Sequence, residues 1–177
     1  MCSSDLASAA HSPTDLFAPS GWLNADALES DGYKALQRAA SWAADTRWET
    51  IRTPHIFMGL LSIGDRRIKA WCRMIGADPD SLLLQFAKLF SRPKSNPPPF
   101  GRFHREFVSE NAMRSLRTAV ARAGRCGRTR IAVADLLVAI FAPRHGIVPV
   151  CFADVGLEPE HLAAIAVAAD ERDSGKS

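Results

Sequence analysis

Polar and apolar positions along this chain predict helices. The same pattern occurs twice, with the second copy eighty residues after the first, and we call this spacing the repeat offset. Apolar residues recur at steps of three and four from Tyr33 to Ala43, and again from Met113 to Ala123, with polar residues between them. This spacing places the apolar side chains on one face of a helix. No two segments show the alternation expected of paired strands. The pattern therefore predicts an all-α protein.

The second helix of each copy is predicted from a nearly continuous apolar run, "IRTPHIFMGLL" at 51–61 and "IAVADLLVAIF" at 131–141. In the first copy we expect this helix to start at Thr53, because a threonine oxygen can accept hydrogen bonds from free backbone amides. Pro54 then occupies the first helical position without losing a hydrogen bond. A helix that is apolar on all sides is usually buried, so each run should form the centre of its repeat.

Two further helices follow in the first copy. One spans about 67–74 and ends at Gly76, since glycine commonly follows the last helical turn. The segment "GADPDSLL" then starts another helix, with Asp78 as N-cap and a proline just after it. The segment "GLEPEHLA" repeats this arrangement in the second copy, with Glu158 in place of the aspartate.

The repeat offset also predicts how the chain is divided. Without a single gap it aligns identical residues such as Leu36 with Leu116 and Gly76 with Gly156, and it keeps the apolar class at most other positions. We predict two pseudo-symmetric four-helix repeats in one eight-helix bundle. The predicted segments are an N-terminal extension (1–28), the first repeat (29–90), a proline-rich linker (91–106), the second repeat (107–169) and a polar tail (170–177).

The doubled unit resembles the N-terminal domain of the Clp/Hsp100 chaperones. The similarity rests on Arg-Thr-Pro-His-Ile-Phe-Met-Gly-Leu-Leu at 52–61, Met-Ile-Gly-Ala-Asp at 74–78 and Asp-Val-Gly-Leu-Glu at 154–158, and it covers roughly residues 29–169. The resemblance implies a pseudo-twofold bundle of eight helices without catalysis of its own. It also implies a docking platform for substrates, adaptors or partner helices.

The chain departs from the family at positions that matter for one ligand. Some members bind phosphorylated arginine through a glutamate in each repeat and a threonine near the start of the first helix. Here the glutamate positions hold Pro54 and Ala134, and the threonine positions hold Glu29 and Ser109. A guanidinium needs a carboxylate partner, so we expect no phosphoarginine recognition of that kind. Glu29 and Ser109 remain candidates for contact with another partner.

Aromatic residues outside the helical stripes are further candidates for binding a partner protein. Phe17 and Trp22 lie in the extension, and Trp48 follows the first helix. Unburied aromatic side chains often anchor partners. Alternatively, the extension folds back and buries Phe17 and Trp22 in a groove of the bundle.

The net charge of +3 is modest, but arginines gather in one stretch. Eight of them lie between Arg102 and Arg130, against Glu106 and Glu110, for a local charge of +6. One interpretation is a surface for nucleic acid or for an acidic protein. The other, which we favour because no aromatic stacking platform accompanies the charge, is the solvated face of a helix. The candidates for an anionic partner are Arg114, Arg117, Arg125 and Arg128.

The residues of catalytic type form no recognisable motif. His55 and Asp135 occupy equivalent places in the two central helices, where they either satisfy local groups or form a base and its orienter. Cys126 has basic neighbours and is either an ordinary loop cysteine or a reactive thiol. The "GKS" at 175–177 has no helix after it and so predicts no phosphate-binding loop. We expect no enzyme, no cofactor and no metal.

These observations lead to two hypotheses for function. The first is a non-catalytic protein-binding module, an adaptor, regulator or docking domain for a chaperone-protease or secretion-linked assembly, with a Clp-type ATPase, a substrate or a partner helix as its partner. The second is a nucleic-acid-binding protein that uses the arginine-rich face. Four widely spaced cysteines and the lack of a long apolar run predict a cytoplasmic protein that does not contact membranes.

Overall fold

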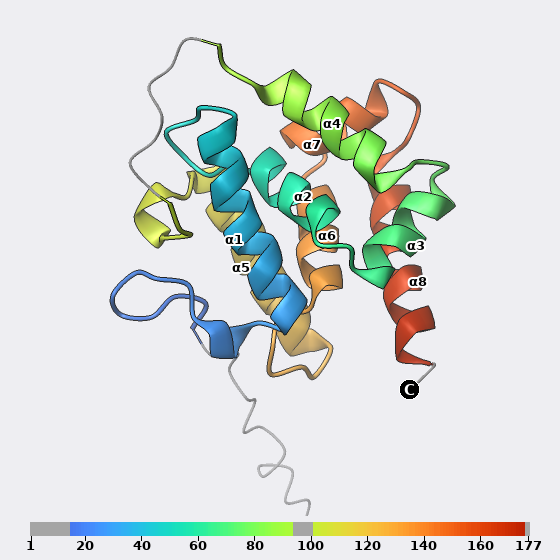
Figure 1. Cartoon of the computed structure of the whole chain (residues 1–177). Coiled ribbons are helices and arrows are strands. Elements are labelled where there is room, and N and C mark those ends of the chain that lie inside the picture. Colours follow the sequence, from blue (N-terminus) through green and yellow to red (C-terminus); the bar gives the residue numbers. More distant parts are fainter. Residues whose placement is uncertain (1–14, 94–100, 176–177) are drawn as a thin grey trace, which may run out of the picture.

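Eight α-helices and two short 3₁₀ turns make up the regular structure of the residues described, 15–93 and 101–175, in this computed structural model (Figure 1). In chain order the elements are η2 (Ala25–Ala27), α1 (Ser30–Asp45), α2 (Thr53–Ser62), α3 (Arg66–Met74), α4 (Pro79–Phe90), η3 (Arg105–Phe107), α5 (Glu110–Arg125), α6 (Val133–Phe141), α7 (Ile147–Ala153) and α8 (Pro159–Ser174). Across those two ranges the backbone forms isolated bridges but no strand. The predicted all-α fold class is confirmed.

The two halves repeat each other closely. Helices α1 and α5 begin and end at positions related by the repeat offset, as do the turns η2 and η3. Each half also reaches into the other at an equivalent place: the Ile51 N–H donates to the Phe107 carbonyl at 2.7 Å, and the Ile131 N–H donates to the Ala27 carbonyl at 2.9 Å. These paired hydrogen bonds join the repeats about a pseudo-twofold axis.

The core lies where the central helices α2 and α6 meet. Helix α2 contacts α1, α4, α6 and α7, and its first nine residues are buried, as the apolar run predicted. The ring of Phe57 meets Phe141 and Phe152 of the other repeat edge-on, with centroids 6.0 and 5.8 Å apart. The indole N–H of Trp71 donates to the Leu162 carbonyl at 3.0 Å. Aromatic contacts across the two repeats therefore hold them in one bundle.

The start of α2 differs from the prediction in its cap. Thr53 is the first helical residue rather than the N-cap, which is Arg52. The His55 side chain, at the third helical position, turns back to the residue before the helix, and its Nδ1 accepts from the Arg52 N–H at 2.9 Å. The predicted cap at Asp78 is confirmed, since its carboxylate accepts from Ser81 N at 2.8 Å. Glu158, by contrast, occupies the N-cap position of α8 without a side-chain hydrogen bond.

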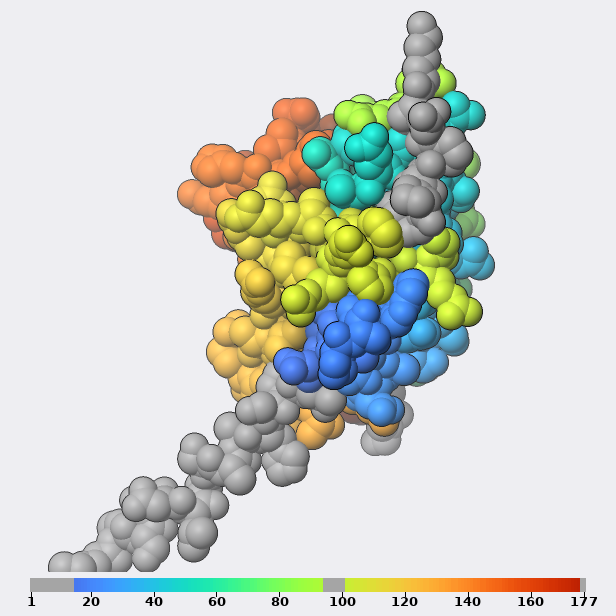
Figure 2. Space-filling view, turned by 90° about the vertical axis from the view of Figure 1, so that its left-hand side faces the viewer, coloured from blue at the N-terminus to red at the C-terminus, as the bar shows by residue number. Residues whose placement is uncertain are grey.

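The described part of the extension packs against the end of the linker. Phe17 stacks on Phe103 with ring centroids 6.1 Å apart, and the Trp22 ring stands edge-on to His104 at 4.6 Å. The Arg105 N–H also donates to the Gly21 carbonyl at 2.9 Å. Figure 2 shows the two segments side by side on one face of the molecule.

Candidate functional site

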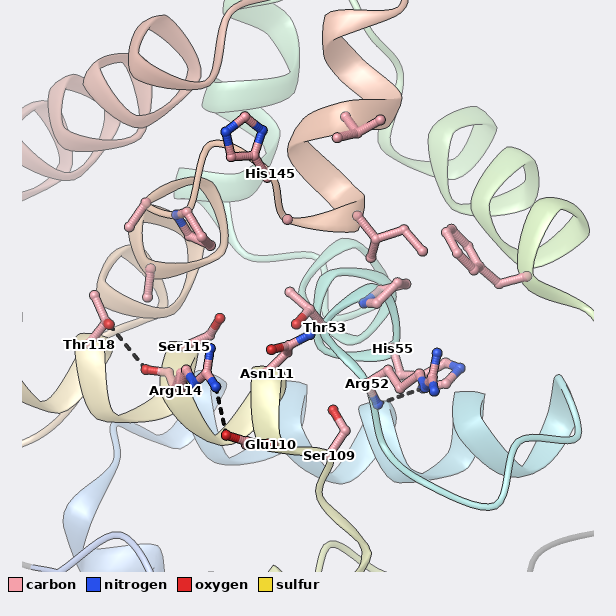
Figure 3. Close-up of a pocket in the computed structure, with 18 of the residues that line it drawn as sticks. Arg52, Thr53, His55, Ser109, Glu110, Asn111, Arg114, Ser115, Thr118 and His145 are labelled. Carbon is pink, nitrogen blue, oxygen red and sulfur yellow. Dashed lines mark hydrogen bonds and ion pairs between the residues drawn. The ribbon is translucent and has the colours of Figure 1, made fainter.

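A cleft lies between the two repeats, where α2, α5 and α7 begin and α4 ends (Figure 3). Its volume is about 1000 Å³. We call it the open cleft and define it by six of the side chains that line it: Trp48, Phe90, Ser109, Arg114, Ile147 and Val150. Both repeats contribute to it, so it is a product of the assembled bundle.

Part of the open cleft is apolar and exposed. Ile147 and Val150 lie one turn apart on α7 and expose 46% and 44% of their surface. Phe90, the last residue of α4, is largely buried and stacks on Phe86 with centroids 5.8 Å apart. Large aliphatic side chains left in water beside a cavity favour contact with another apolar surface.

Trp48 gives the open cleft an aromatic group with two cations against it. Its indole N–H donates to the Phe90 carbonyl at 2.6 Å, which ties the residue to the end of α4. The guanidinium carbons of Arg52 and Arg92 lie 4.5 and 3.9 Å from the centre of the indole ring. Both are cation–π distances, so the ring and the arginines form one surface.

His55 lies beneath this surface as a neutral hydrogen-bonding group. It is 1% exposed, its Nδ1 accepts from the Arg52 N–H, and its Nε2 lies 3.2 Å from the Thr46 hydroxyl. Burial, with a smaller contribution from the Arg52 charge, lowers the pKa of His55 from 6.5 to about 3. An Nδ1 that accepts leaves the proton on Nε2, directed at Thr46. His55 therefore holds the start of α2 in place.

The remaining part of the open cleft is polar and comes mainly from α5. Ser109 is the N-cap of α5, and its hydroxyl accepts from Ala112 N at 3.3 Å. Glu110 and Arg114 form an ion pair at 2.6 Å one turn apart on the same helix. The carbonyl of Arg114 also accepts from the Thr118 hydroxyl. The Arg114 cation is thus already balanced by a neighbouring carboxylate.

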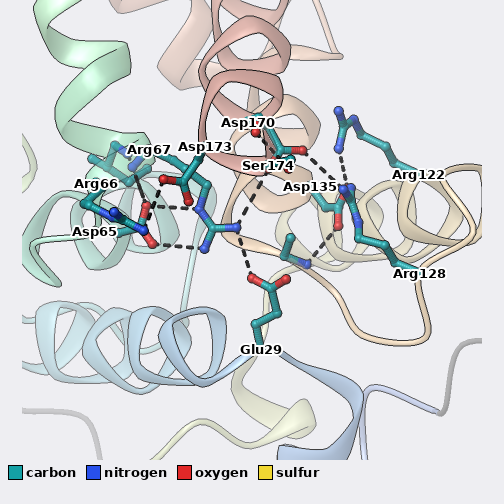
Figure 4. Close-up of polar contacts among 12 residues, drawn as sticks. Glu29, Asp65, Arg66, Arg67, Arg122, Arg128, Asp135, Asp170, Asp173 and Ser174 are labelled. Atoms are coloured by element: carbon teal, nitrogen blue, oxygen red, sulfur yellow. Dashed lines mark hydrogen bonds and ion pairs between the residues drawn. The ribbon is translucent and has the colours of Figure 1, made fainter. Parts of the chain in front are cut away.

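On the other side of the pseudo-twofold axis lies a cluster of charged side chains (Figure 4). We call it the ion-pair network and define it as Glu29, Asp65, Arg67, Arg122, Arg128, Asp135 and Asp170. Arg67 pairs with Glu29 and Asp65 at 3.0 Å each and lies 3.8 Å from Asp170. The guanidinium of Arg128 contacts Asp135 and lies 3.2 Å from Asp170. The network therefore connects both repeats.

Asp135 is the most deeply buried member of the network, with 0% exposure. One of its carboxylate oxygens accepts from Ala132 N at 2.8 Å, and the other contacts both Arg122 and Arg128. Elsewhere in the network the hydrogen bonds and charge of Arg67 outweigh burial and lower the pKa of Asp65. Each buried carboxylate is thus matched by arginine.

The open cleft and the ion-pair network use positions that the repeat offset makes equivalent. The pairs, each with the residue of the cleft first, are Trp48 and Arg128, His55 and Asp135, Phe90 and Asp170, Ser109 and Glu29, His145 and Asp65, and Ile147 and Arg67. In every pair the network has an arginine or a carboxylate where the cleft has an aromatic, aliphatic, hydroxyl or imidazole group. In one region charged side chains pair with each other, whereas in the other these positions surround an open cavity.

The structure separates the candidates named from the sequence. Trp48, Ser109 and Arg114 line the open cleft, whereas Glu29 and Arg128 belong to the ion-pair network. Phe17 is half-buried on Phe103, and Trp22 is 47% exposed; neither lines the open cleft. Arg117 and Arg125 are exposed on α5. Sequence reasoning missed Phe90, Ile147 and Val150, although the repeat offset sets Ile147 opposite a charged Arg67.

The residues considered as candidates for catalysis lie in separate surroundings. His55 and Asp135 contact different partners, and Cys126 is exposed just after α5. Among residues 15–93 and 101–175 no three histidine, cysteine, aspartate or glutamate side chains group as metal ligands. Within the same ranges no helix is both long and apolar enough to cross a bilayer. The "GKS" segment at 175–177 lies largely outside the described residues.

Comparison with known proteins places the chain among chaperone domains. Residues 30–151 match the family described as the Clp repeat (R) N-terminal domain. The N-terminal domain of the caseinolytic protease associated chaperone ClpD from Arabidopsis thaliana is 16% identical, with a TM-score of 0.63, over 82% of this chain and 95% of that one. The Hsp104 N-terminal domain from Candida albicans is 13% identical, with a TM-score of 0.64, over 79% and 89%. A comparison with curated protein sequences finds no match.

Proposed function

Because the chain belongs to the Clp repeat (R) N-terminal domain family, we propose that it is a non-catalytic docking module whose open cleft holds a segment of a partner polypeptide. Domains with this fold are protein-interaction modules of Clp/Hsp100 chaperones. The finer role proposed is that of an adaptor, regulator or docking domain for a chaperone-protease or secretion-linked assembly in the cytoplasm. Its partner is a Clp-type ATPase, a substrate or a partner helix.

The observation that carries this proposal is the exposure of apolar side chains inside a cleft of about 1000 Å³ between the repeats. Ile147 and Val150 leave almost half of their surface in water there. A segment that covered them would bury apolar surface worth roughly 25 cal/mol per Å². Such central apolar contacts usually supply most of the binding energy of a docking surface.

The surroundings of the titratable groups support a module that performs no reaction. The neutral His55 is fully engaged between the Arg52 amide and Thr46. Burial, together with the charge of Asp78, raises the pKa of the Cys72 thiol to about 12, so it stays protonated at neutral pH. Neither group is poised to activate a nucleophile.

Val150 and Val155 provide a matched pair of variants to test the proposal. Val150 lines the open cleft, whereas Val155 lies just beyond the end of α7 and exposes 72% of its surface outside the cleft. Val150→Asp should lower recovery of a dominant protein partner from a lysate of the source organism by about tenfold, because a carboxylate would be desolvated on docking. Val155→Asp should retain that partner at the level of the unmodified protein.

The same pull-down at low and high salt distinguishes the alternative. An apolar cleft keeps its partner as salt rises, whereas nucleic acid held by arginines is released steeply. Recovery of mixed nucleic acid alone, lost at high salt and unaffected by Val150→Asp, would overturn the proposal. Circular dichroism of both variants establishes that they fold alike.

A further inference from the structure

We infer that the open cleft selects a partner segment in which an acidic side chain lies next to large apolar ones. This inference rests on the proposed function and adds to it the chemistry of the partner. The apolar side chains of that segment would cover Ile147, Val150 and the edge of Phe90. Its carboxylate would pair with the arginines that lie against Trp48.

The first step of the argument is the charge left over at the Trp48 surface. Arg52 and Arg92 lie against the indole, and no carboxylate of the described residues forms an ion pair with either of them. Arg52 lines the cleft, whereas Arg92 contacts the same indole without lining it. The other charged residues that line the cleft, Arg114 and Glu110, already pair with each other. The cleft therefore has an excess of positive charge at its aromatic side.

The second step is a comparison within the molecule. In the ion-pair network the arginines have acidic partners: Arg67 has Glu29 and Asp65, and Arg128 has Asp135 and Asp170. At the Trp48 surface the chain provides two cations without an acid. A partner that supplies a carboxylate there would complete an arrangement that the protein completes for itself on the other side of the axis.

The third step is the geometry of a guanidinium held against an indole. Contact with the ring occupies a face of the guanidinium and leaves N–H groups at its edge free to donate. A carboxylate accepts such donors in charge-assisted hydrogen bonds, which are stronger when the site is partly shielded from water. The apolar side chains of the same segment would provide that shielding. Acid and apolar groups are thus expected close together in the partner.

The test uses a library of random dodecapeptides displayed on phage and selected on the folded protein. We expect the recovered sequences to be enriched in aspartate or glutamate within about three positions of leucine, isoleucine or phenylalanine. A selected peptide, made synthetically with a fluorescent label, should bind about tenfold more tightly than its twin in which each acid is replaced by its amide. Fluorescence anisotropy measures both affinities.

Two double variants show which arginines cause the preference for the acidic peptide. Arg52→Gln with Arg92→Gln should reduce the advantage of the acidic peptide over its amide twin from about tenfold to less than twofold, while the twin binds as before. Arg117→Gln with Arg125→Gln removes two exposed arginines of α5 that do not line the cleft and should leave the advantage intact. Thermal unfolding of each variant shows whether it is folded.

The outcomes separate the two proposals. Selected peptides that bind with no preference for acid, and that lose binding in Val150→Asp, would overturn the inference and leave the proposed function standing. An acidic preference that persists in Arg52→Gln with Arg92→Gln and disappears in the control double variant would also overturn it. Peptides that bind Val150→Asp as tightly as the unmodified protein, or a selection that enriches none, would overturn both.

Discussion

The open cleft and the ion-pair network are built largely from helix ends that the repeat offset makes equivalent, on opposite sides of the pseudo-twofold axis. In the network, acids and arginines from both repeats meet and satisfy one another. In the cleft the equivalent positions hold aromatic, aliphatic, hydroxyl and imidazole groups with a cavity between them. The difference shows that equivalent positions of a symmetric fold can carry different chemistry: in one region charged side chains pair with each other, and in the other a cavity remains, which we propose a partner fills.

The contrast is sharpest at one position of the central helices. His55 and Asp135 each turn back to accept a hydrogen bond from the backbone N–H three residues earlier, at 2.9 and 2.8 Å. The two side chains thus perform the same local task. A buried carboxylate, however, needs cations around it, whereas a neutral imidazole does not. Asp135 accordingly contacts Arg122 and Arg128, and the His55 ring has Trp48 edge-on at 5.9 Å.

The largest loss of stability is expected from neutralising Asp135, at the centre of the ion-pair network. Asp135→Asn keeps the shape of the side chain but leaves Arg122 and Arg128 without their shared carboxylate. Losing one partner of a buried ion pair typically costs about 3–5 kcal/mol of unfolding free energy. Urea denaturation at pH 7 measures it, with the midpoint and slope fitted together.

Asp173 provides the control for that substitution. It pairs with Arg66 at 3.3 Å, and the arginine is 83% exposed, so Asp173→Asn should change the free energy of unfolding by less than about 0.5 kcal/mol. A loss below about 1 kcal/mol for Asp135→Asn would mean that the network contributes little, and the comparison between a filled and an empty site would then fail.

A smaller loss of stability, confined to a range of pH, is expected from the protonation of His55. Its pKa is about 3 in the folded protein and near 6.5 when the chain unfolds. Between those values the unfolded state binds the extra proton, so stability falls as the pH drops. At pH 5 we expect about 2 kcal/mol less stability than at pH 8, measured by urea denaturation across a pH series.

The matched variant for the pH series is His55→Gln. Glutamine keeps an acceptor oxygen for the Arg52 N–H but carries no titratable group. The difference between pH 8 and pH 5 should then shrink to less than about 0.5 kcal/mol. If His55→Gln and the unmodified protein lost equal stability over this range, other groups would be responsible, and the neutral role of His55 at the open cleft would be wrong.

The helical frame was predictable because it depends on local periodicity. The repeat offset and the apolar spacing predicted both repeats, and the observed α1 and α5 preserve that offset at both ends. The predicted cap of α2 was one residue too late, because Thr53 is already helical and Arg52 is the N-cap. The His55 imidazole accepts from the Arg52 amide. The exact residue at which a helix begins is the part that a sequence pattern determines least.

The site itself was only partly predictable. Trp48 and Ser109 were named as candidates and do line the open cleft, but Phe90 and Ile147 were not named. Those two residues come from different repeats and line the same cavity only in the folded bundle. The signal was present in the alignment of the two copies, where Ile147 stands opposite Arg67. Reading it requires knowing which helix ends face each other across the axis.

The smallest effect on stability, with a large effect on binding, is expected when the open cleft is given the charges of the network. Ser109→Glu with Ile147→Arg introduces the residues found at the equivalent Glu29 and Arg67, which pair at 3.0 Å. The exposure of Ile147 and the modest cost of losing a serine cap should keep the change in unfolding free energy below about 1 kcal/mol. Recovery of the partner should nevertheless fall about tenfold, because an internal ion pair would occupy the cleft and remove its central apolar contact.

Val155→Arg, outside the cleft, should leave recovery unchanged. Partner binding that survived the double substitution would show that docking takes place elsewhere, and that the apolar character of this cleft serves some purpose other than leaving room for another chain.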